Sequence, residues 1–216
     1  MSTDRFTTEQ VAVRVAAALA PDQVVNLGIG QPTAILPHVR PDAGIIFHCE
    51  NGIIGMGAGM ADPAEADPDL ASAGGTPVSL VTGAAIVHHA DSFSLARNGR
   101  LDIAILGAYQ VAANGDLANW RLPGAKTGNI GGAMDLAAGA RQVWVMMTHV
   151  DKDGRPKIVE AVTYPVTARA CVTRVFTDLA VLSITRQGVR VDELAPGVSF
   201  EALQRVTAVK LLAGTR

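Results

Sequence analysis

The 216-residue sequence is short of charge, because only 18% of its residues are Asp, Glu, Lys or Arg, where about 25% is usual in soluble proteins. Its 18 basic and 20 acidic residues leave a net charge of −2. The sequence also has few aromatic residues (2 Trp, 2 Tyr and 5 Phe), and no segment combines them with a basic cluster. We therefore expect no nucleic-acid-binding surface.

Cysteines and long apolar runs are also scarce. Cys49 and Cys171 lie far apart and form no CxxC pair, so neither a disulfide framework nor a metal site is expected. No apolar run approaches the ~18 residues of a membrane span. The N-terminus has no basic segment followed by an apolar stretch, so we expect no signal peptide. These absences predict a cytoplasmic protein with no membrane segment.

What the sequence does contain is small and apolar residues. Hydrophobic residues make up 49% of the chain and 22 glycines come in addition, and the mean hydropathy is +0.26. Such a composition is typical of an α/β protein whose parallel strands are buried. The low charge also suggests that a partner covers part of the surface. Because no repeat or linker divides the sequence, we expect residues 1–216 to form a single domain with a mainly parallel sheet flanked by helices.

Local patterns predict the order of the elements. Thr7 and Gln10 form a capping box before a helix that ends near Pro21. A glycine-rich region at 114–132 shows almost no periodicity and is long for a structureless segment, which suggests a functional loop. Strands are expected at 24–27, 44–49, 78–82, 101–106 and 142–148, a strand pair at 172–184 and 188–193, and helices at 92–97 and from Ser199.

Several motifs suggest chemistry only weakly. The GxGxxT segment at 28–33 lacks the third glycine of a dinucleotide-binding loop. His88 and His89 could be a metal pair, but neighbours at a strand end point in opposite directions. We therefore favour one buried and one pocket-lining histidine over a chelating pair. His48 lies in an apolar strand and is expected to be a hydrogen-bonded core histidine.

Glu50 is the strongest candidate functional residue. It ends an apolar strand, and the glycine-rich segment 52–59 follows it. Ligands of α/β sheets bind at the carboxyl ends of parallel strands, and glycines leave backbone N–H groups free to face a negative charge. A second glycine-rich segment, 128–135, could complete such a pocket. Two interpretations remain open: a carboxylate ion-paired at a strand end, or a nucleophile or base beside backbone donors.

Long motifs around Glu50 make a family resemblance visible. Glu50-Asn51-Gly52 followed by IIGMG resembles the catalytic motif of the β subunit of family I CoA-transferases, and further matches follow in the family's order from about residue 10 to 205. These are NLGIGQPT at 26–33, HHADSFSLARNG at 88–99, LDIAILGAYQV at 101–111, GDLANW at 115–120, GGAMDLAAGARQVWVMMTH at 131–149 and YPVTARACVTRVFTDLAVL at 164–182. The resemblance implies a domain of the CoA-transferase (NagB/RpiA-like) type.

The resemblance also implies a covalent mechanism. Glu50 would attack an acyl-CoA thioester and then carry CoA as a glutamyl thioester, from which the acceptor acid takes it. Asn51, Gly131 and Gly132 are the candidates for stabilising the oxyanion and binding CoA. The family needs no metal and no separate cofactor, since coenzyme A enters as part of the substrate.

Within the family, the segments HHADSF, RQVWVMM and TYPVT resemble the 3-oxoadipate branch, which serves aromatic degradation in the β-ketoadipate pathway. That likeness implies succinyl-CoA as donor and 3-oxoadipate as acceptor. A dicarboxylate needs a cationic or donor-rich site, which His88, His89 or Arg121 could supply. Cys49 replaces the family's usual serine, and segment 71–80 lacks a common CoA-contacting lysine.

Three alternatives accompany this prediction. The chain could serve acetoacetate or another short 3-oxoacid, or it could be an acyl-CoA hydrolase if the altered segments admit water. A non-catalytic subunit is the third alternative, and the intact Glu50 argues against it. The family builds its active site between two related domains, so the resemblance implies a separate α subunit in a heterodimer or heterotetramer.

Overall fold

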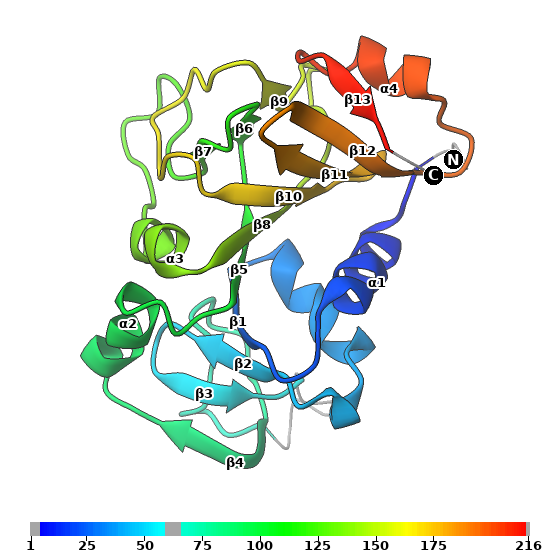
Figure 1. Cartoon of the computed structure of the whole chain (residues 1–216). Coiled ribbons are helices and arrows are strands. Elements are labelled where there is room, and N and C mark those ends of the chain that lie inside the picture. Colours follow the sequence, from blue (N-terminus) through cyan, green and yellow to red (C-terminus); the bar gives the residue numbers. More distant parts are fainter. Residues whose placement is uncertain (1–4, 59–65, 215–216) are drawn as a thin grey trace.

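The computed structural model describes residues 5–58 and 66–214. They form a ten-stranded sheet in the order β13-β12-β11-β10-β8-β5-β1-β2-β3-β4 and a three-stranded sheet in the order β7-β6-β9 (Figure 1). The large sheet contains β1 (Val24–Leu27), β2 (Ile46–Cys49), β3 (Ile53–Met56), β4 (Leu80–Ile86), β5 (Ile103–Gly107), β8 (Gln142–Met146), β10 (Val172–Phe176), β11 (Ala180–Thr185), β12 (Gly188–Leu194) and β13 (Leu211–Ala213). The small sheet contains β6 (Gln110–Ala112), β7 (Leu117–Ala118) and β9 (Ile158–Val159). The helices are α1 (Thr8–Ala18), α2 (His89–Arg97), α3 (Ala133–Gly139), α4 (Phe200–Arg205) and the 3-10 helices η1 (Gln31–His38) and η2 (Pro41–Ala43).

The centre of the large sheet is parallel. Neighbours in the series β2-β1-β5-β8-β10 all run in the same direction, and β12 is parallel to β13. The remaining pairs, β2-β3, β3-β4, β10-β11 and β11-β12, are antiparallel. Among the described pairings of this sheet, parallel ones are therefore the more numerous. The prediction of an α/β domain with a mainly parallel sheet is confirmed.

Alternate strand residues fill two cores, one on each face of the sheet, as the two-residue period of a strand requires. Ile103 and Ile105 of β5 pack with α1 and η1, in a cluster that includes Val15 and Ile35. Ala104 and Leu106, the alternate residues, pack with α2 and α3. Figure 1 shows α1 on one side of the central strands and α2 and α3 on the other. Because both faces are covered, the central strands are mostly apolar, with Asn26 of β1 and His48 of β2 as buried polar exceptions.

Most predicted elements are present, with three main differences. Thr7 caps α1 through the expected box with Gln10, and Ser199 caps α4. The segment 172–184, expected as one strand, is two antiparallel strands, β10 and β11. The strand expected at 78–82 begins and ends later, as β4, and β3 was not expected at all. No helix in residues 5–58 or 66–214 is long and apolar enough to cross a membrane.

Candidate active site

Glu50 lies in the tight turn of the β2-β3 hairpin, directly after the parallel strand β2. The Gly52 N–H donates to the Cys49 carbonyl (3.0 Å) and closes the turn. Gly52 has φ = +123°, and a Cβ there would lie 2.3 Å from the Val87 carbonyl oxygen. Only glycine fits this position. The Glu-Asn-Gly sequence thus places Glu50 at the carboxyl end of the sheet, where ligands of α/β proteins bind.

A buried hydrogen-bond chain anchors the strand that carries Glu50. Asn26 Nδ2 donates to His48 Nδ1 (3.0 Å), and His48 Nε2 lies 2.8 Å from Ser92 Oγ. Ser92 Oγ in turn donates to the Cys49 carbonyl (3.3 Å), one residue before Glu50. Burial lowers the pKa of His48, which favours the neutral ring. His48 is therefore the hydrogen-bonded core histidine that its apolar strand predicted.

The Glu50 carboxylate faces the Gly131-Gly132 segment. A Cβ on Gly132 would lie 2.6 Å from Glu50 Oε2, and one on Gly131 would lie 3.9 Å from Glu50 Oε1. Partial burial raises the pKa of Glu50, while a hydrogen bond from the Gly132 backbone N–H and the charge of His89 act in the opposite direction. Burial is the largest of these effects. The carboxylate is thus more basic than a free glutamate and lies beside the Gly132 backbone.

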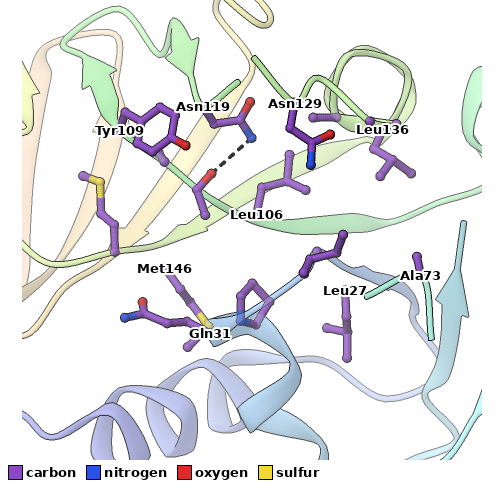
Figure 2. A pocket seen from close by; sticks show the side chains of 18 of the residues that line it. Leu27, Gln31, Ala73, Leu106, Tyr109, Asn119, Asn129, Leu136 and Met146 are labelled. Atoms are coloured by element: carbon purple, nitrogen blue, oxygen red, sulfur yellow. Dashed lines mark hydrogen bonds between the residues drawn. The ribbon is translucent and has the colours of Figure 1, made fainter. Parts of the chain in front are cut away.

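Glu50 opens onto a cavity of about 480 Å³ at the carboxyl ends of β1, β5 and β8. Figure 2 shows Tyr109, Asn119 and Asn129 on one side of it, across from Gln31 and Met146. The Asn119 side chain is held by a bond from its Nδ2 to the Gly107 carbonyl (3.1 Å). The cavity is lined by Leu27, Gly28, Ile29, Gln31, Pro32, Glu50, Ala73, Leu106, Gly107, Ala108, Tyr109, Asn119, Asn129, Ile130, Gly131, Gly132, Ala133, Leu136, Met146, Met147, Thr148 and Lys157.

Of the residues singled out in the sequence, Glu50, Gly131 and Gly132 lie on this cavity, whereas Asn51, His88, His89 and Arg121 are not among its lining residues. The Asn51 amide instead donates to the Ala71 carbonyl (2.7 Å). Arg121 is exposed and its Nε donates to the Ala125 carbonyl (3.2 Å). The structure therefore brings together the nucleophile candidate and the second glycine-rich segment. Of the expected cations, His89 acts on the pKa of Glu50 without lining the cavity, and His88 and Arg121 do not line it either.

The expectation that His88 and His89 end a strand, one of them buried, is wrong. His88 caps α2, with Nδ1 accepting from the Ala90 N–H (3.1 Å), and His89 is the first residue of that helix. Both side chains are exposed, and the His89 ring packs 4.8 Å from the Phe93 ring. A histidine at a helix start replaces the usual Ser or Asp cap, which is why the sequence did not indicate the boundary. Within the described ranges, no three His, Cys, Asp or Glu side chains are grouped to hold a metal ion.

The glycines after Glu50 have a different role from the one expected. The Gly57 N–H donates to the Ser79 carbonyl (2.8 Å), and a Cβ on Gly55 would lie 3.0 Å from Ala84 Cα of β4. These glycines permit close pairing of β3 with β4 and do not offer free N–H groups to a ligand. Gly59 lies outside the described residues. The donor next to Glu50 comes instead from Gly132.

Sequence reasoning missed one cavity residue of chemical interest, Lys157. It directly precedes the short strand β9 and is the lining residue that brings positive charge to the cavity. Burial lowers its pKa to about 8, against the charges of Asp178 and Asp151, which raise it. A lone lysine before a two-residue strand has no distinguishing local pattern. Its position only becomes apparent once β8 and β9 are placed.

Comparisons with known proteins show the family of the chain. The family model "Coenzyme A transferase" matches residues 8–205. The chain belongs to the coenzyme A transferase family. It is 49% identical over 212 residues to a subunit of the 3-oxoadipate CoA-transferase of Pseudomonas putida, covering 97% of this chain and 98% of that protein. It is 45% identical over 218 residues to the subunit of the same name from Acinetobacter baylyi, covering all of both. It is 39% identical to a subunit of the succinyl-CoA:3-ketoacid coenzyme A transferase of Helicobacter pylori, over 92% of this chain and 95% of that one.

Solved structures share the fold of this coenzyme A transferase chain. The acyl-CoA transferase YdiF from Escherichia coli O157:H7 superimposes with a TM-score of 0.77 at 20% identity, over 97% of this chain but 42% of its own. This chain therefore spans less than half of that enzyme. The decarboxylase AibA/AibB superimposes with a TM-score of 0.66 at 19% identity, over 95% of this chain and 85% of its own. A fold shared with a decarboxylase does not specify the reaction, so the reaction must be argued from the site.

Proposed function

We propose that this chain is the catalytic β subunit of a 3-oxoacid CoA-transferase that moves CoA from succinyl-CoA to 3-oxoadipate through a thioester on Glu50. The observation that carries the proposal is the Glu50 carboxylate, which opens onto the cavity directly beside the Gly131-Gly132 backbone. The names of the Pseudomonas putida and Acinetobacter baylyi relatives support the choice of acid. Coenzyme A is part of the substrate, and the mechanism requires no metal or other cofactor.

The first half-reaction has two steps. A Glu50 oxygen attacks the thioester carbonyl carbon, the C–S bond breaks, and the CoA thiolate leaves with the electron pair, which gives an acyl-glutamyl anhydride. The thiolate then attacks the Glu50 carbonyl carbon and expels the donor acid as a carboxylate. The acceptor acid reverses both steps. No proton is gained or lost, so Glu50 needs no neighbouring base.

Gly132 has a particular part in the second step. When the thiolate attacks the Glu50 carbonyl carbon, negative charge develops on the glutamate oxygen that lies beside the Gly132 backbone. A donor that is already in place stabilises such an oxyanion, and removal of one donor costs ~2.7–4 kcal/mol in other enzymes. We assign this role to Gly132, with Gly131 beside it. Asn51 would first have to break its bond to Ala71.

The cavity lining supports transfer over hydrolysis. Leu27, Leu106, Leu136 and Met146 present apolar surface around Glu50, and exclusion of water protects an anhydride or thioester from hydrolysis. Cys49, which replaces the family's usual serine, is itself buried, and its Sγ accepts the Ala73 N–H (3.1 Å). That contact holds segment 71–80 against the Glu50 turn. The altered segment is therefore bonded to the turn at Cys49 and Asn51.

A separate α subunit completes the proposed enzyme, in a heterodimer or heterotetramer. The relatives are named as subunits and not as whole enzymes, and the YdiF enzyme is more than twice as long as the part that this chain matches. The second candidate acceptor is a short 3-oxoacid such as acetoacetate. It is supported by the name of the Helicobacter pylori relative.

The proposal is tested by producing the chain with a CoA-transferase α subunit and measuring initial rates of CoA transfer. We expect parallel double-reciprocal plots for succinyl-CoA and 3-oxoadipate, the pattern of a covalent ping-pong mechanism. We also expect a higher kcat/KM for 3-oxoadipate than for acetoacetate. The exposed Glu160→Gln variant is the matched control for Glu50→Gln. CoA release at the full rate without any acceptor acid would identify a hydrolase and reject the proposal.

A further inference from the structure

The cavity is lined by few charged side chains. Among the described residues that line it, Glu50 and Lys157 are the ones that carry charge at neutral pH, and the others are apolar or neutral polar residues. Glu50 is the proposed reacting group. Lys157 has no role in the chemistry derived above, because the reaction moves no proton. A partly buried lysine on a cavity wall therefore needs another explanation.

The main chain of Lys157 is held firmly. Its N–H donates to the His149 carbonyl (3.2 Å) and its carbonyl accepts the Val111 N–H (2.9 Å). Through these bonds Lys157 joins the small sheet to the segment that follows β8. Thr148, which precedes His149, lies on the same cavity wall. The lysine thus has a defined place at the end of β8.

The Lys157 ammonium makes no ion pair within 4 Å in the described part of the chain. The two acids whose charges act on it, Asp178 and Asp151, are bonded elsewhere. Asp178 accepts from Arg5 Nη1 (2.7 Å) and from the His149 N–H (2.7 Å). Asp151 Oδ1 accepts the backbone N–H groups of residues 153 and 155. The ammonium therefore keeps donors available for a ligand.

Glu50 and Lys157 both line the cavity and reach it from different parts of the fold. Glu50 follows β2, and Lys157 is bonded to the residue three beyond the end of β8, with β1 and β5 between those strands. Three strand spacings separate β2 from β8 by roughly 14 Å. The flexible four-carbon stem of a lysine shortens that gap by several ångströms. A small acid with one end at Glu50 can thus bring its other end to Lys157.

We propose that Lys157 binds the distal carboxylate of a dicarboxylic acid whose reacting carboxylate lies at Glu50. The inference rests on the proposed function and adds the substrate class: acids with two carboxylates. It gives the lining lysine the role that the sequence suggested for His88, His89 or Arg121. In a ping-pong mechanism donor and acceptor acids occupy the site in turn, so Lys157 would serve both succinate and 3-oxoadipate.

The test uses the assembled enzyme, loaded with CoA by incubation with acetoacetyl-CoA, a donor without a distal carboxylate. Discharge of the loaded enzyme is then timed with 3-oxoadipate and with 3-oxohexanoate, which carries a methyl group in place of that carboxylate. We expect Lys157→Met to slow discharge by 3-oxoadipate about 10- to 100-fold, the value of a charged hydrogen bond. Discharge by 3-oxohexanoate should change little, which also shows that the variant is folded. Lys157→Arg should keep part of the preference for 3-oxoadipate over 3-oxohexanoate that Lys157→Met loses.

The same assay at different pH values gives an independent readout. Burial lowers the pKa of Lys157 to about 8, with Asp178 and Asp151 raising it, and His149 is held neutral because burial lowers its pKa to about 4. The preference for the diacid should therefore decline as the pH rises through about 8, while discharge by 3-oxohexanoate does not.

The outcomes separate the two claims. A Lys157→Met enzyme that keeps the wild-type preference for 3-oxoadipate, or that discharges both acids more slowly by the same factor, overturns the role of Lys157 alone. A wild-type enzyme that takes up CoA from neither succinyl-CoA nor acetoacetyl-CoA overturns the proposed function, and this inference with it.

Discussion

Glu50 is a charge that folding partly removes from water. Burial raises its pKa more than the Gly132 N–H and His89 lower it, so the folded chain binds a proton at Glu50 more tightly than the unfolded chain does. Ionisation of this group therefore opposes folding. This loss of stability is absent at a pH below the pKa that Glu50 has in the unfolded chain. It reaches its full size at a pH above the pKa that Glu50 has in the folded chain. A charged nucleophile in a partly buried site therefore lowers the stability of the folded chain at neutral pH.

The first prediction concerns Glu50→Gln, which keeps the shape of the side chain and removes the charge. At pH 7 the variant should unfold at the same or a higher temperature than the natural chain, while CoA transfer is lost. The gap in melting temperature should shrink toward pH 4, where the natural Glu50 becomes neutral. Melting curves at both pH values test this. A variant that is clearly less stable at pH 7 would show that Glu50 is a structural ion-pair partner.

The second prediction concerns Gly132→Ala. The φ of Gly132 is −87°, which alanine adopts freely, so the backbone itself tolerates the change. The added Cβ would meet Glu50 Oε2 at 2.6 Å and the Phe93 ring at 2.6 Å. The carboxylate must move, and misplacement of a reacting atom by about 1 Å costs roughly 100-fold in rate. We expect kcat to fall by that order; unchanged kcat would remove Gly132 from the site.

Single residues differed in how far the sequence could identify them. Glu50 stood out because an acidic residue ended an apolar strand, and Gly131-Gly132 because glycines clustered. Lys157 and Tyr109 could not be identified, because their place on the cavity depends on the pairing of β6 and β9 across the chain. His88 and His89 misled, because a histidine cap has no strong sequence signal.

At the scale of elements, the β2-β3 hairpin depends on α2. Ser92 of α2 links the His48 ring to the Cys49 carbonyl, and all three groups are buried. The Asn26 amide completes the chain from β1. One helix and two strands are thus fastened together one residue before Glu50. Loss of a link leaves a buried polar group without a partner, which costs more than the bond itself.

The third prediction follows from that chain. Ser92→Ala removes the partner of His48 Nε2 and should lower the free energy of unfolding by about 1–3 kcal/mol. It should also lower kcat more than it raises KM, because the turn that carries Glu50 loses its anchor. Ser94→Ala is the matched control, since the exposed Ser94 hydroxyl bonds only to the Ala90 carbonyl of its own helix. Equal stability of the two variants would contradict the anchoring role.

Helices and strands were predicted best where a local sequence pattern, such as a helix cap, determines where the element begins. The capping box at Thr7 and the cap at Ser199 lie where expected. Strand β3 was missed because its glycine, Gly55, which is typical of a loop, is required by contact with β4. The break between β10 and β11 was missed because residues 177–179 form a turn closed by Thr177, whose Oγ1 accepts the Ala180 N–H (3.0 Å). The first error concerns a contact between two strands, and the second a local turn closed by a side chain.

At the scale of the whole molecule, β4 is an apolar strand at the edge of the large sheet, with one of its sides unpaired in the described ranges. Leu80, Val81 and Ile86 are 39%, 50% and 67% exposed. Exposed apolar edge strands invite pairing with another chain. Because β4 adjoins the hairpin that carries Glu50, we expect the α subunit to cover it. The low charge of the sequence had already suggested a covered surface.

The fourth prediction tests this interface. Val81→Lys places a charge on the β4 edge and should weaken co-purification with the α subunit, together with CoA transfer. Val13→Lys is the control, because Val13 is similarly exposed (43%) but lies on α1. The isolated chain should be inactive, and added α subunit should restore transfer. Full activity of the lone chain, or two variants that bind equally well to the α subunit, would contradict the placement.

The most direct test of the account is the mass of the Glu50 peptide after reaction. The assembled enzyme is incubated with succinyl-CoA without an acceptor, digested, and analysed by mass spectrometry. We predict that CoA is found as a thioester on Glu50, that 3-oxoadipate discharges it, and that Glu50→Gln carries none. CoA attached to another residue, or a competent enzyme that never carries CoA on Glu50, would contradict the account.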